Sequence, residues 1–252
     1  MKLLAWPLLF LSMVLSTFAD AEPDKRPLVV AMPTMDDDPE HGIEHPLVLL
    51  VRDWGKKLNR EIIVQRYPFK RSLMHAANGD VDFHFPLILD PQTSPADLPF
   101  AYSTSVVTKV NFVLYTREGH ELDLDNLGQY NIATFSGHGK LFPFDVIEDH
   151  SIEGSLRKLQ LGRIDGYIFA DNGGDPALLE LGLTGIHRQL YKVYDVHAVL
   201  AHGRKGGEVD QFITDAVNLQ SVELQALAMV NQPYLDWQVG DEAIPALVHS
   251  GR

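Results

Sequence analysis

The sequence of 252 residues contains no cysteine. Disulfide bonds, a cysteine nucleophile and attachment of a lipid through cysteine are therefore excluded. Since no disulfide can compensate for a weak core, the hydrophobic core alone must hold the fold together. The sequence also lacks a Gly-x-Ser-x-Gly motif and a phosphate-binding loop, so two common signals of enzymatic chemistry are missing.

Basic residues are scarce. The chain has 21 Lys and Arg against 34 Asp and Glu, which gives a formal net charge of -13. Such a charge repels nucleic acids and anionic lipids, so we expect neither as a partner, whereas cations are attracted. Long apolar runs are also missing beyond the N-terminal region, so no later segment is expected to cross a membrane.

The N-terminus has the pattern of a secretory signal peptide. Lys2 precedes the apolar run Leu3–Leu15, and Ala19-Asp20-Ala21 is a small-x-small cleavage site. We expect residues 1–21 to be removed and the remaining chain to reach a bacterial periplasm. A membrane anchor is the alternative, but the apolar run is shorter than the ~20 residues that span a bilayer.

One pattern occurs twice along the chain: a short helix, a turn with glycine and aspartate, and a buried strand. The first copy is a helix over 69–78, the turn Gly79–Asp82 and a strand over 82–89. The second copy is a helix over 151–161 followed by a strand over 164–170. Two such units predict two similar α/β lobes that face each other across a cleft, where small molecules bind.

The other elements follow from apolar periodicity and from turn residues. We expect a mostly parallel sheet flanked by helices in each lobe, with lobe one formed by residues 22–105 and 196–252 and lobe two by residues 106–195. Crossings near residues 103–110 and 190–197 then form a hinge. The remaining expected strands are 28–32, 61–67, 106–116, 131–135 and 189–201, and the remaining expected helices are 46–58, 124–127, 175–181, 209–217 and 221–230.

The order of these parts resembles a known family. Pro68-Phe69-Lys70-Arg71 begins the first helix, Gly79-Asp80-Val81-Asp82 follows it, and Gly162-Arg163-Ile164-Asp165-Gly166-Tyr167 marks the second lobe. Over nearly all of the chain after residue 21, this arrangement resembles the bacterial extracellular solute-binding proteins of family 3, which have the two-lobed type 2 periplasmic binding fold. The resemblance implies a monomer without cofactor or enzymatic activity. It also implies capture of an amino acid or another small polar solute for an inner-membrane ABC permease.

One arginine that the resemblance implies is missing. Transporting members carry it in a Thr-x-x-x-Arg context before the crossover strand, where its guanidinium binds the ligand carboxylate through two parallel hydrogen bonds. Here no arginine occurs between Arg71 and Arg117, and Asp97 lies near the expected position. Asp171 matches the acidic residue that binds the ligand amino group. This combination favours a cation, an amine or a neutral polar solute, whereas Arg71 or Lys140 can substitute if the ligand is anionic.

Ligands contact the carboxyl ends of strands in parallel α/β lobes, so the residues at strand exits are the candidates. The turn Ser136–Gly139 exposes backbone N–H groups that can bind an anionic or carbonyl oxygen. An ordinary turn is its alternative, and core packing is the alternative for the buried-strand candidates. For Asp171 the alternative is helix capping or a salt bridge at the hinge. The expected ligand-binding residues are Asp36, Arg71, His84, Phe85, Tyr102, Ser103, Ser136, Gly137, His138, Asp171 and Asn172.

Other chemistries are weaker alternatives. In the acidic segment 36–45, His41 and His45 are four residues apart, which on a helix would suit zinc or copper. A proline and a glycine disfavour that helix, so we expect a solvated loop and no metal. Glu148, Asp149 and His150 are adjacent and point in different directions, which disfavours acid–base catalysis.

Three functions remain open from the sequence. We expect a binding protein for transport. A sensory binding protein that presents its ligand to a kinase or chemoreceptor is the second reading. A dehydratase-like or lyase-like enzyme on the same fold is the third, and it requires a buried carboxylate with a raised pKa in the cleft.

Overall fold

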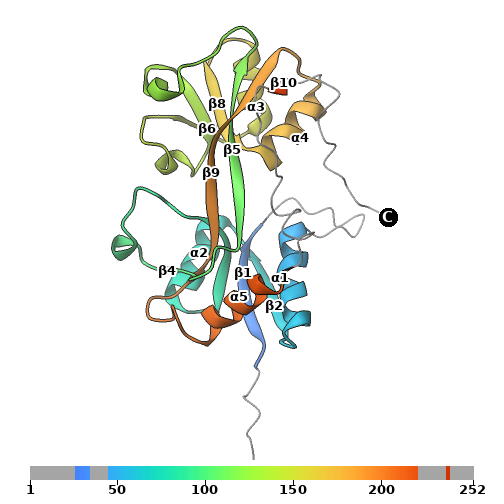
Figure 1. Ribbon diagram of the computed structural model, residues 1–252, viewed down its shortest axis with the longest axis vertical. Coiled ribbons are helices and arrows are strands. Elements are labelled where there is room, and N and C mark those ends of the chain that lie inside the picture. Colours follow the sequence, from blue (N-terminus) through green and yellow to red (C-terminus); the bar gives the residue numbers. More distant parts are fainter. Residues whose placement is uncertain (1–25, 35–44, 221–236, 239–252) are drawn as a thin grey trace, which may run out of the picture.

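The structure, a computed structural model, describes residues 26–34, 45–220 and 237–238. It consists of two α/β halves stacked along the long axis of the molecule and joined by two long strands, β5 (Thr108–Arg117) and β9 (Ile186–Leu200) (Figure 1). All strands belong to one sheet, in the order β2-β1-β3-β9-β5-β8-β6-β7, with β4 and β10 paired to β9. Among the described residues, no helix has the length and apolar character needed to cross a membrane.

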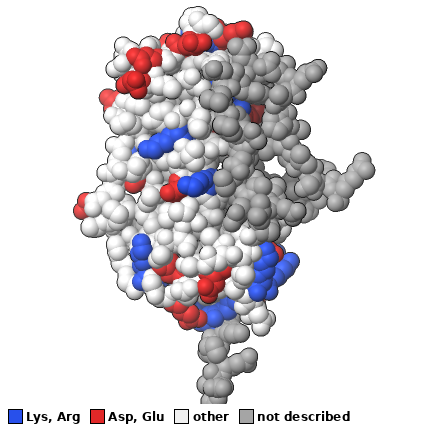
Figure 2. Space-filling model, viewed as in Figure 1, with Lys and Arg blue, Asp and Glu red and all other residues white. Residues whose placement is uncertain are grey.

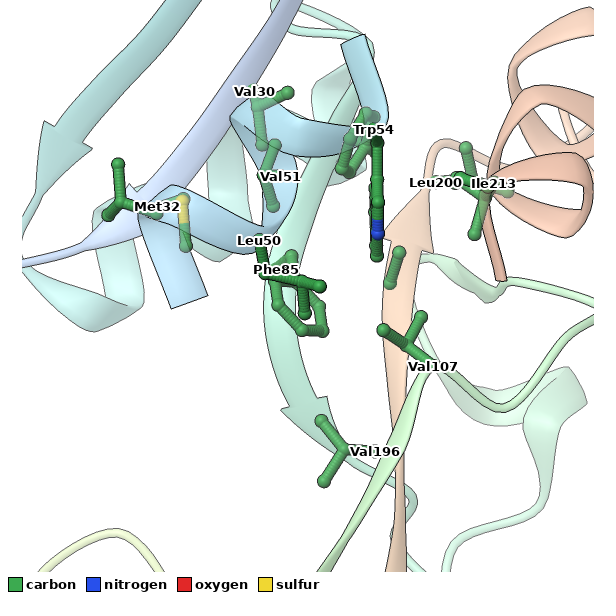
Figure 3. Close-up of a cluster of buried hydrophobic side chains, with 14 residues drawn as sticks. Val30, Met32, Leu50, Val51, Trp54, Phe85, Val107, Val196, Leu200 and Ile213 are labelled. Carbon is green, nitrogen blue, oxygen red and sulfur yellow. The ribbon is translucent and has the colours of Figure 1, made fainter. Parts of the chain in front are cut away.

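Lobe one is built around a parallel three-stranded unit. Strand β1 pairs in parallel with both β2 and β3, and helices α1, α2 and α5 pack around the sheet (Figure 1). Trp54 on α1 is fully buried against Phe85 on β3, with 5.8 Å between the ring centroids, in the cluster drawn in Figure 3. The elements of lobe one are β1 (Leu28–Pro33), α1 (Pro46–Lys57), β2 (Ile62–Tyr67), α2 (Phe69–Asn78), β3 (Phe83–Ile88), the 3-10 turn η1 (Pro95–Asp97), β4 (Ala101–Tyr102) and α5 (Glu208–Asn218).

Lobe two repeats this plan on the other side of the hinge. Strand β6 pairs in parallel with β7 and β8, β8 pairs antiparallel with β5, and α3 and α4 contact each other beside the sheet. Two apolar clusters fill this lobe, and fully buried Tyr115 and Phe112 belong to one each. The elements are η2 (Leu124–Gln129), β6 (Ile132–Phe135), η3 (Gly139–Leu141), β7 (Ile147–Asp149), α3 (Ile152–Gln160), β8 (Gly166–Ala170) and α4 (Asp171–Leu181).

The hinge consists of the two strands that run through both halves. Strands β5 and β9 pair antiparallel from Thr108 opposite Val196 to Arg117 opposite Ile186. Beyond this ladder β9 continues into lobe one, where it pairs with β3 and β4. The Nζ atom of Lys109 lies 2.6 Å from a carboxylate oxygen of Asp195, its partner in the ladder.

The aspartates of the repeated turns perform the same structural task in both lobes. Asp82, which is 3% exposed, accepts hydrogen bonds from the Val29 N–H at 2.8 Å and from the Arg26 guanidinium. Asp165 in the second copy accepts from the Asn131 backbone N–H at 2.8 Å. Val29 lies in β1 and Asn131 directly precedes β6, so each aspartate fixes the start of the neighbouring parallel strand. The sequence repeat therefore reflects strand anchoring.

Removing the charge of Asp82 is expected to destabilise lobe one. Burial raises the pKa of this carboxyl, but the bonds from Arg26 and Val29 outweigh burial, so the pKa lies below its usual value. The stabilisation is therefore present above the unfolded pKa and is lost as pH falls through the folded pKa. Asp82→Asn should lose about 1–3 kcal/mol in urea unfolding at pH 7, because a buried hydrogen-bonded group loses its charged partner.

The matched control is Asp80→Asn in the same turn. Asp80 is exposed and contacts His75 at 3.0 Å. Its replacement should change the unfolding free energy by less than about 0.5 kcal/mol. Equal effects of the two replacements would contradict the anchoring role of Asp82.

Most predicted elements are confirmed, and the helix over 69–78 has the predicted bounds. The helix predicted from 175 is wrong at its start, since α4 begins at Asp171. A Cβ on Gly174 would lie 2.2 Å from the Tyr115 hydroxyl, so glycine there reflects close packing and not a break in the helix. Strand β7 was not predicted, because its residues are mostly exposed and do not alternate in polarity.

Two predictions concern the C-terminal part. Strand β10 (Trp237–Gln238) pairs with β9 opposite Arg188 and His187, beside lobe two, although the sequence assigned this range to lobe one. The helix predicted over 221–230 lies outside the described residues, as do the signal peptide over 1–21 and most of the acidic segment 36–45.

Candidate functional site

The directions of the strands bring two sheet edges together. Strand β9 runs from lobe two to lobe one, and β5 and β3 are both antiparallel to it. It follows that β8, β6 and β7 point their carboxyl ends toward lobe one, and that β3, β1 and β2 point theirs toward lobe two. Ligands of parallel α/β sheets bind at such ends, so the candidate site lies where the two edges meet (Figure 1).

Asp171 lies at the lobe-two edge, directly after β8 and at the start of α4. Its side chain is 2% exposed. One carboxylate oxygen accepts from Asn111 Nδ2 at 3.0 Å and the other from the Asn172 N–H at 2.7 Å. Asn111 comes from β5 and Asn172 is exposed, so the carboxylate is held between the hinge strand and the start of α4. A carboxylate buried in this way favours a positively charged or hydrogen-bond-donating partner.

The turn after β6 already binds a carboxylate of the protein. The N–H groups of Gly137 and Gly139 each donate to Glu148 at 3.1 Å, and Ser136 Oγ donates to it at 3.2 Å. These bonds, with that of Gly137 foremost, hold the pKa of Glu148 below its usual value although desolvation opposes them. Gly137 has a φ of 92°, which glycine adopts without strain. The N–H groups of the turn thus donate to one carboxylate, and binding of a ligand by this turn stays a prediction.

Glu148 was not among the expected site residues. It lies on β7, opposite Thr134 of β6, and strand pairing brings it to the turn. The sequence shows only the adjacent trio 148–150, in which nothing marks the pairing. The neighbouring Asp149 points elsewhere, since it accepts from Ser155 at 2.9 Å and from Lys158.

Aromatic rings surround the same edge of lobe two. The half-buried His138 ring meets Phe169 edge-on, with 5.3 Å between centroids, and Phe135 lies 5.4 Å from Phe169. Burial lowers the pKa of His138, although its Nδ1 bonds the Phe135 carbonyl oxygen at 3.1 Å. His138 is therefore neutral at pH 7, and its ring adds apolar surface beside the turn.

The lobe-one candidates within β3 are buried in the core. His84 accepts from Ser72 Oγ at 2.7 Å on Nδ1 and donates from Nε2 to the Pro86 carbonyl oxygen at 3.1 Å. Burial lowers the pKa of His84 to about 4, so the ring is neutral at pH 7 with both nitrogens bonded. Phe85 is fully buried against Trp54. Both positions match the core-packing alternative that the sequence left open.

Tyr102 and Ser103 are also buried, and both bond to backbone. The Tyr102 hydroxyl donates to the Ile88 carbonyl oxygen and accepts from the Asp90 N–H, each at 3.2 Å. Ser103 Oγ donates to the Ser105 carbonyl oxygen at 2.9 Å.

These two residues support the loops at the lobe-one edge, whereas Arg71 in the first turn of α2 is exposed. Asp36 lies outside the described residues. A role for any of these residues in ligand binding stays a prediction.

A second buried carboxylate lies one helical turn behind Asp171. Asp175 accepts from the Tyr115 hydroxyl at 2.8 Å and forms an ion pair with Arg188, which is 1% exposed. Burial raises the pKa of Asp175 to about 6 against the opposing effects of Arg188 and Tyr115. A raised pKa is what an enzymatic reading requires, but both oxygens of this carboxylate bond to protein groups. Within residues 26–34 and 45–220, His, Asp and Glu form no cluster suited to a metal ion.

Comparison with known proteins gives the fold. No family model and no curated protein matches the sequence. The ligand-binding core of GluR0 from Nostoc punctiforme, solved with L-glutamate, is 16% identical, with 76% of this chain and 92% of that chain covered and a TM-score of 0.57.

Two further structures are similar. A histidine kinase sensor domain with similarity to periplasmic binding proteins is 15% identical, with 78% and 91% of the chains covered and a TM-score of 0.59. An ancestral arginine-binding protein bound to arginine is 12% identical, with 76% and 90% covered and a TM-score of 0.55. The chain has the two-lobed α/β fold of type 2 periplasmic binding proteins, as the resemblance of its sequence predicted.

Proposed function

We propose that the protein binds a small polar solute between its two lobes and releases it unchanged to a membrane partner. The observation that carries this proposal is the meeting of two carboxyl-end sheet edges across the hinge strands β5 and β9. Rotation about the two strands would close the edges on a ligand. The ligand stabilises the closed form by binding it more tightly than the open form, and a partner can recognise that form.

The chemistry of the two edges supports a cationic, amine-bearing or neutral polar ligand. Lobe two contributes the buried carboxylate of Asp171. The loop before the crossover contains no arginine, and Asp97 lies near the position where the resemblance implies one. Arg71 is exposed at the lobe-one edge and is the candidate partner for an anionic group of the ligand. Two of the similar structures contain L-glutamate or arginine, which are small polar solutes.

The charge distribution agrees with a solute as the ligand. On the face shown in Figure 2, acidic side chains gather over the far end of lobe two, while the lobe-one end carries both signs. Nucleic-acid binding requires clustered lysines and arginines, whereas this chain has a net charge of -13.

The signal-peptide pattern of residues 1–21 supports action in a periplasm, and the family resemblance supports a monomer. Delivery to an ABC permease is the role we favour. The similarity to a kinase sensor domain supports presentation to a sensor as the second candidate.

A ligand screen tests the proposal. Small molecules released from protein purified from its own periplasm would be identified by mass spectrometry. They would then be tested beside amines, amino acids, sugars and divalent metals by thermal shift and small-angle X-ray scattering. A ligand present at one hundred times its dissociation constant should stabilise the protein by about 2.7 kcal/mol and should reduce its radius of gyration. Stabilisation without compaction would contradict closure, and turnover of the ligand would indicate an enzyme.

A further inference from the structure

The carboxylate of Glu148 fills the donor set of the turn that follows β6. Oε2 accepts from Gly137 N–H at 3.1 Å and from Ser136 Oγ at 3.2 Å, and Oε1 accepts from Gly139 N–H at 3.1 Å. A bidentate carboxylate ligand would make the same set of contacts. The turn therefore holds an anionic group in this structure, and the group belongs to the protein.

The carboxylate lies in close contact with the backbone of the turn. A Cβ atom built on Gly139 would lie 2.5 Å from Oε1, so any larger residue at 139 would push the carboxylate out. Pairing of β6 with β7 fixes Glu148 opposite Thr134, two residues before Ser136. Strand pairing thus brings the backbone of Glu148 to the turn, and its exposed side chain reaches the three donors from there.

We propose that Glu148 determines specificity: it occupies the anion-binding position of the Ser136–Gly139 turn and excludes ligands that place a negative group there. This inference rests on the proposed binding function. An anionic ligand group would have to displace Glu148 from three hydrogen bonds and would then lie beside its charge, which is unfavourable. A ligand with an amine or a neutral group at this end meets no such penalty.

No other carboxylate contacts these donors, among the contacts that the structure describes. Asp149, the next residue, uses its side chain on Ser155 and Lys158. The backbone oxygen of Asp149 accepts from the Ser136 N–H at 2.7 Å, which keeps the turn attached to β7 whatever occupies position 148. Removing the Glu148 side chain should therefore free the N–H groups of Gly137 and Gly139 and the Ser136 hydroxyl, while the turn stays bonded to β7.

Acetate is the probe for the vacated position. Glu148→Ala is titrated with acetate, which replaces chloride at constant ionic strength. The amide signals of Gly137 and Gly139 in nitrogen–proton correlation spectra should shift and then reach a plateau. The affinity of acetate should be at least about tenfold higher than for the unchanged protein, where Glu148 competes. Asp145→Ala is the matched control, since Asp145 is exposed and its removal changes the net charge equally. This control should respond to acetate like the unchanged protein.

Two results would overturn the inference. One is an equal response to acetate in the unchanged protein and in Glu148→Ala. The other is no response in Glu148→Ala while its spectrum shows a folded turn. If the alanine variant alters the turn, Glu148→Gln keeps the side-chain length without the charge. There the Gly137 and Gly139 signals should move less as pH falls through the acidic range than in the unchanged protein, because only the neighbouring His138 and Asp149 still titrate. Movement of undiminished size would equally reject Glu148 as the occupant.

Matched ligands extend the test to specificity. The unchanged protein should bind agmatine or cadaverine at least about tenfold more tightly than arginine or lysine, and Glu148→Ala should narrow that ratio. If both proteins bind arginine or lysine more tightly than agmatine or cadaverine, Glu148 does not determine the specificity. That result would not contradict the proposed binding of a solute. Since the acetate experiment uses no solute, its outcome is independent of the screen that tests the proposed function.

Discussion

Replacing Asp171 with alanine is expected to lower ligand affinity by about 30-fold to 5,000-fold, because the loss of a buried charged partner costs about 2–5 kcal/mol. Asp171 is 2% exposed and is held by Asn111 and Asn172, so its carboxylate is already oriented before a ligand arrives. A pre-oriented group binds without a further ordering cost. The measurement is calorimetric titration with the solute of the screen that gives the largest thermal shift.

Asp171→Asn separates charge from shape. Its side-chain oxygen can still accept from Asn111, and the N–H of the exposed Asn172 can bond to water instead, so the fold and melting temperature should stay close to those of the unchanged protein while affinity for a cationic solute falls. The control is Asp145→Ala, an exposed residue at which the same change of charge should leave affinity unchanged. Unaltered affinity in both Asp171 variants would remove this residue from the site.

Arg188→Leu is expected to destabilise the protein by about 3–5 kcal/mol at pH 7, because it leaves the Asp175 carboxylate buried without its charged partner. Arg188 is 1% exposed and pairs with Asp175 behind the binding edge. Urea unfolding followed by circular dichroism measures the effect. The double variant Arg188→Leu with Asp175→Asn is the control and should recover most of the loss, since no unpaired charge remains.

The effect of Arg188→Leu should depend on pH. Burial, partly offset by Arg188 and Tyr115, raises the folded pKa of Asp175 to about 6 from a usual value of 3.8. A raised carboxyl pKa means that the folded state binds the proton more tightly than the unfolded state. The free-energy cost of burying ionised Asp175 is therefore absent below the unfolded pKa and grows as pH rises toward 6. Without Arg188 this cost increases. The unfolding free energy of the variant should therefore be closest to that of the unchanged protein in acid. A difference that does not vary with pH would refute this origin.

Local signals in the sequence were sufficient for much of the fold. Helix α2 has its predicted bounds because Pro68 precedes it and Gly79, with a φ of 79°, ends it in the left-handed conformation. The start of α4 was missed: the helix was predicted over 175–181, whereas it begins at Asp171 and includes Gly173 and Gly174, which have low helix propensity. In the structure Gly173 leaves room for the ring of Phe169, and Gly174 leaves room for the ring of Tyr115. Tyr115 is remote in sequence, so its contact with Gly174 could not be predicted from local signals.

The position of some candidate residues at strand exits was predictable, but their contacts were not. Asp171 follows β8 and the turn Ser136–Gly139 follows β6. Because these strands are parallel, both positions were expected at the same edge of the sheet. His84 and Phe85 lie within a strand instead of after it, and their side chains point into the core. Glu148 could not be found from spacing, because its contact with the turn arises from the pairing of β6 with an exposed edge strand.

The chain order of lobe one has a consequence for biosynthesis. The cluster around Trp54 includes Ala198 and Leu200 from β9 and Ile213 and Ala216 from α5 (Figure 3). A ribosome must therefore release the chain through α5 before this half can close its interior. Until β9 and α5 have been synthesised, the apolar side chains around Trp54 lack part of their packing and stay accessible to chaperones.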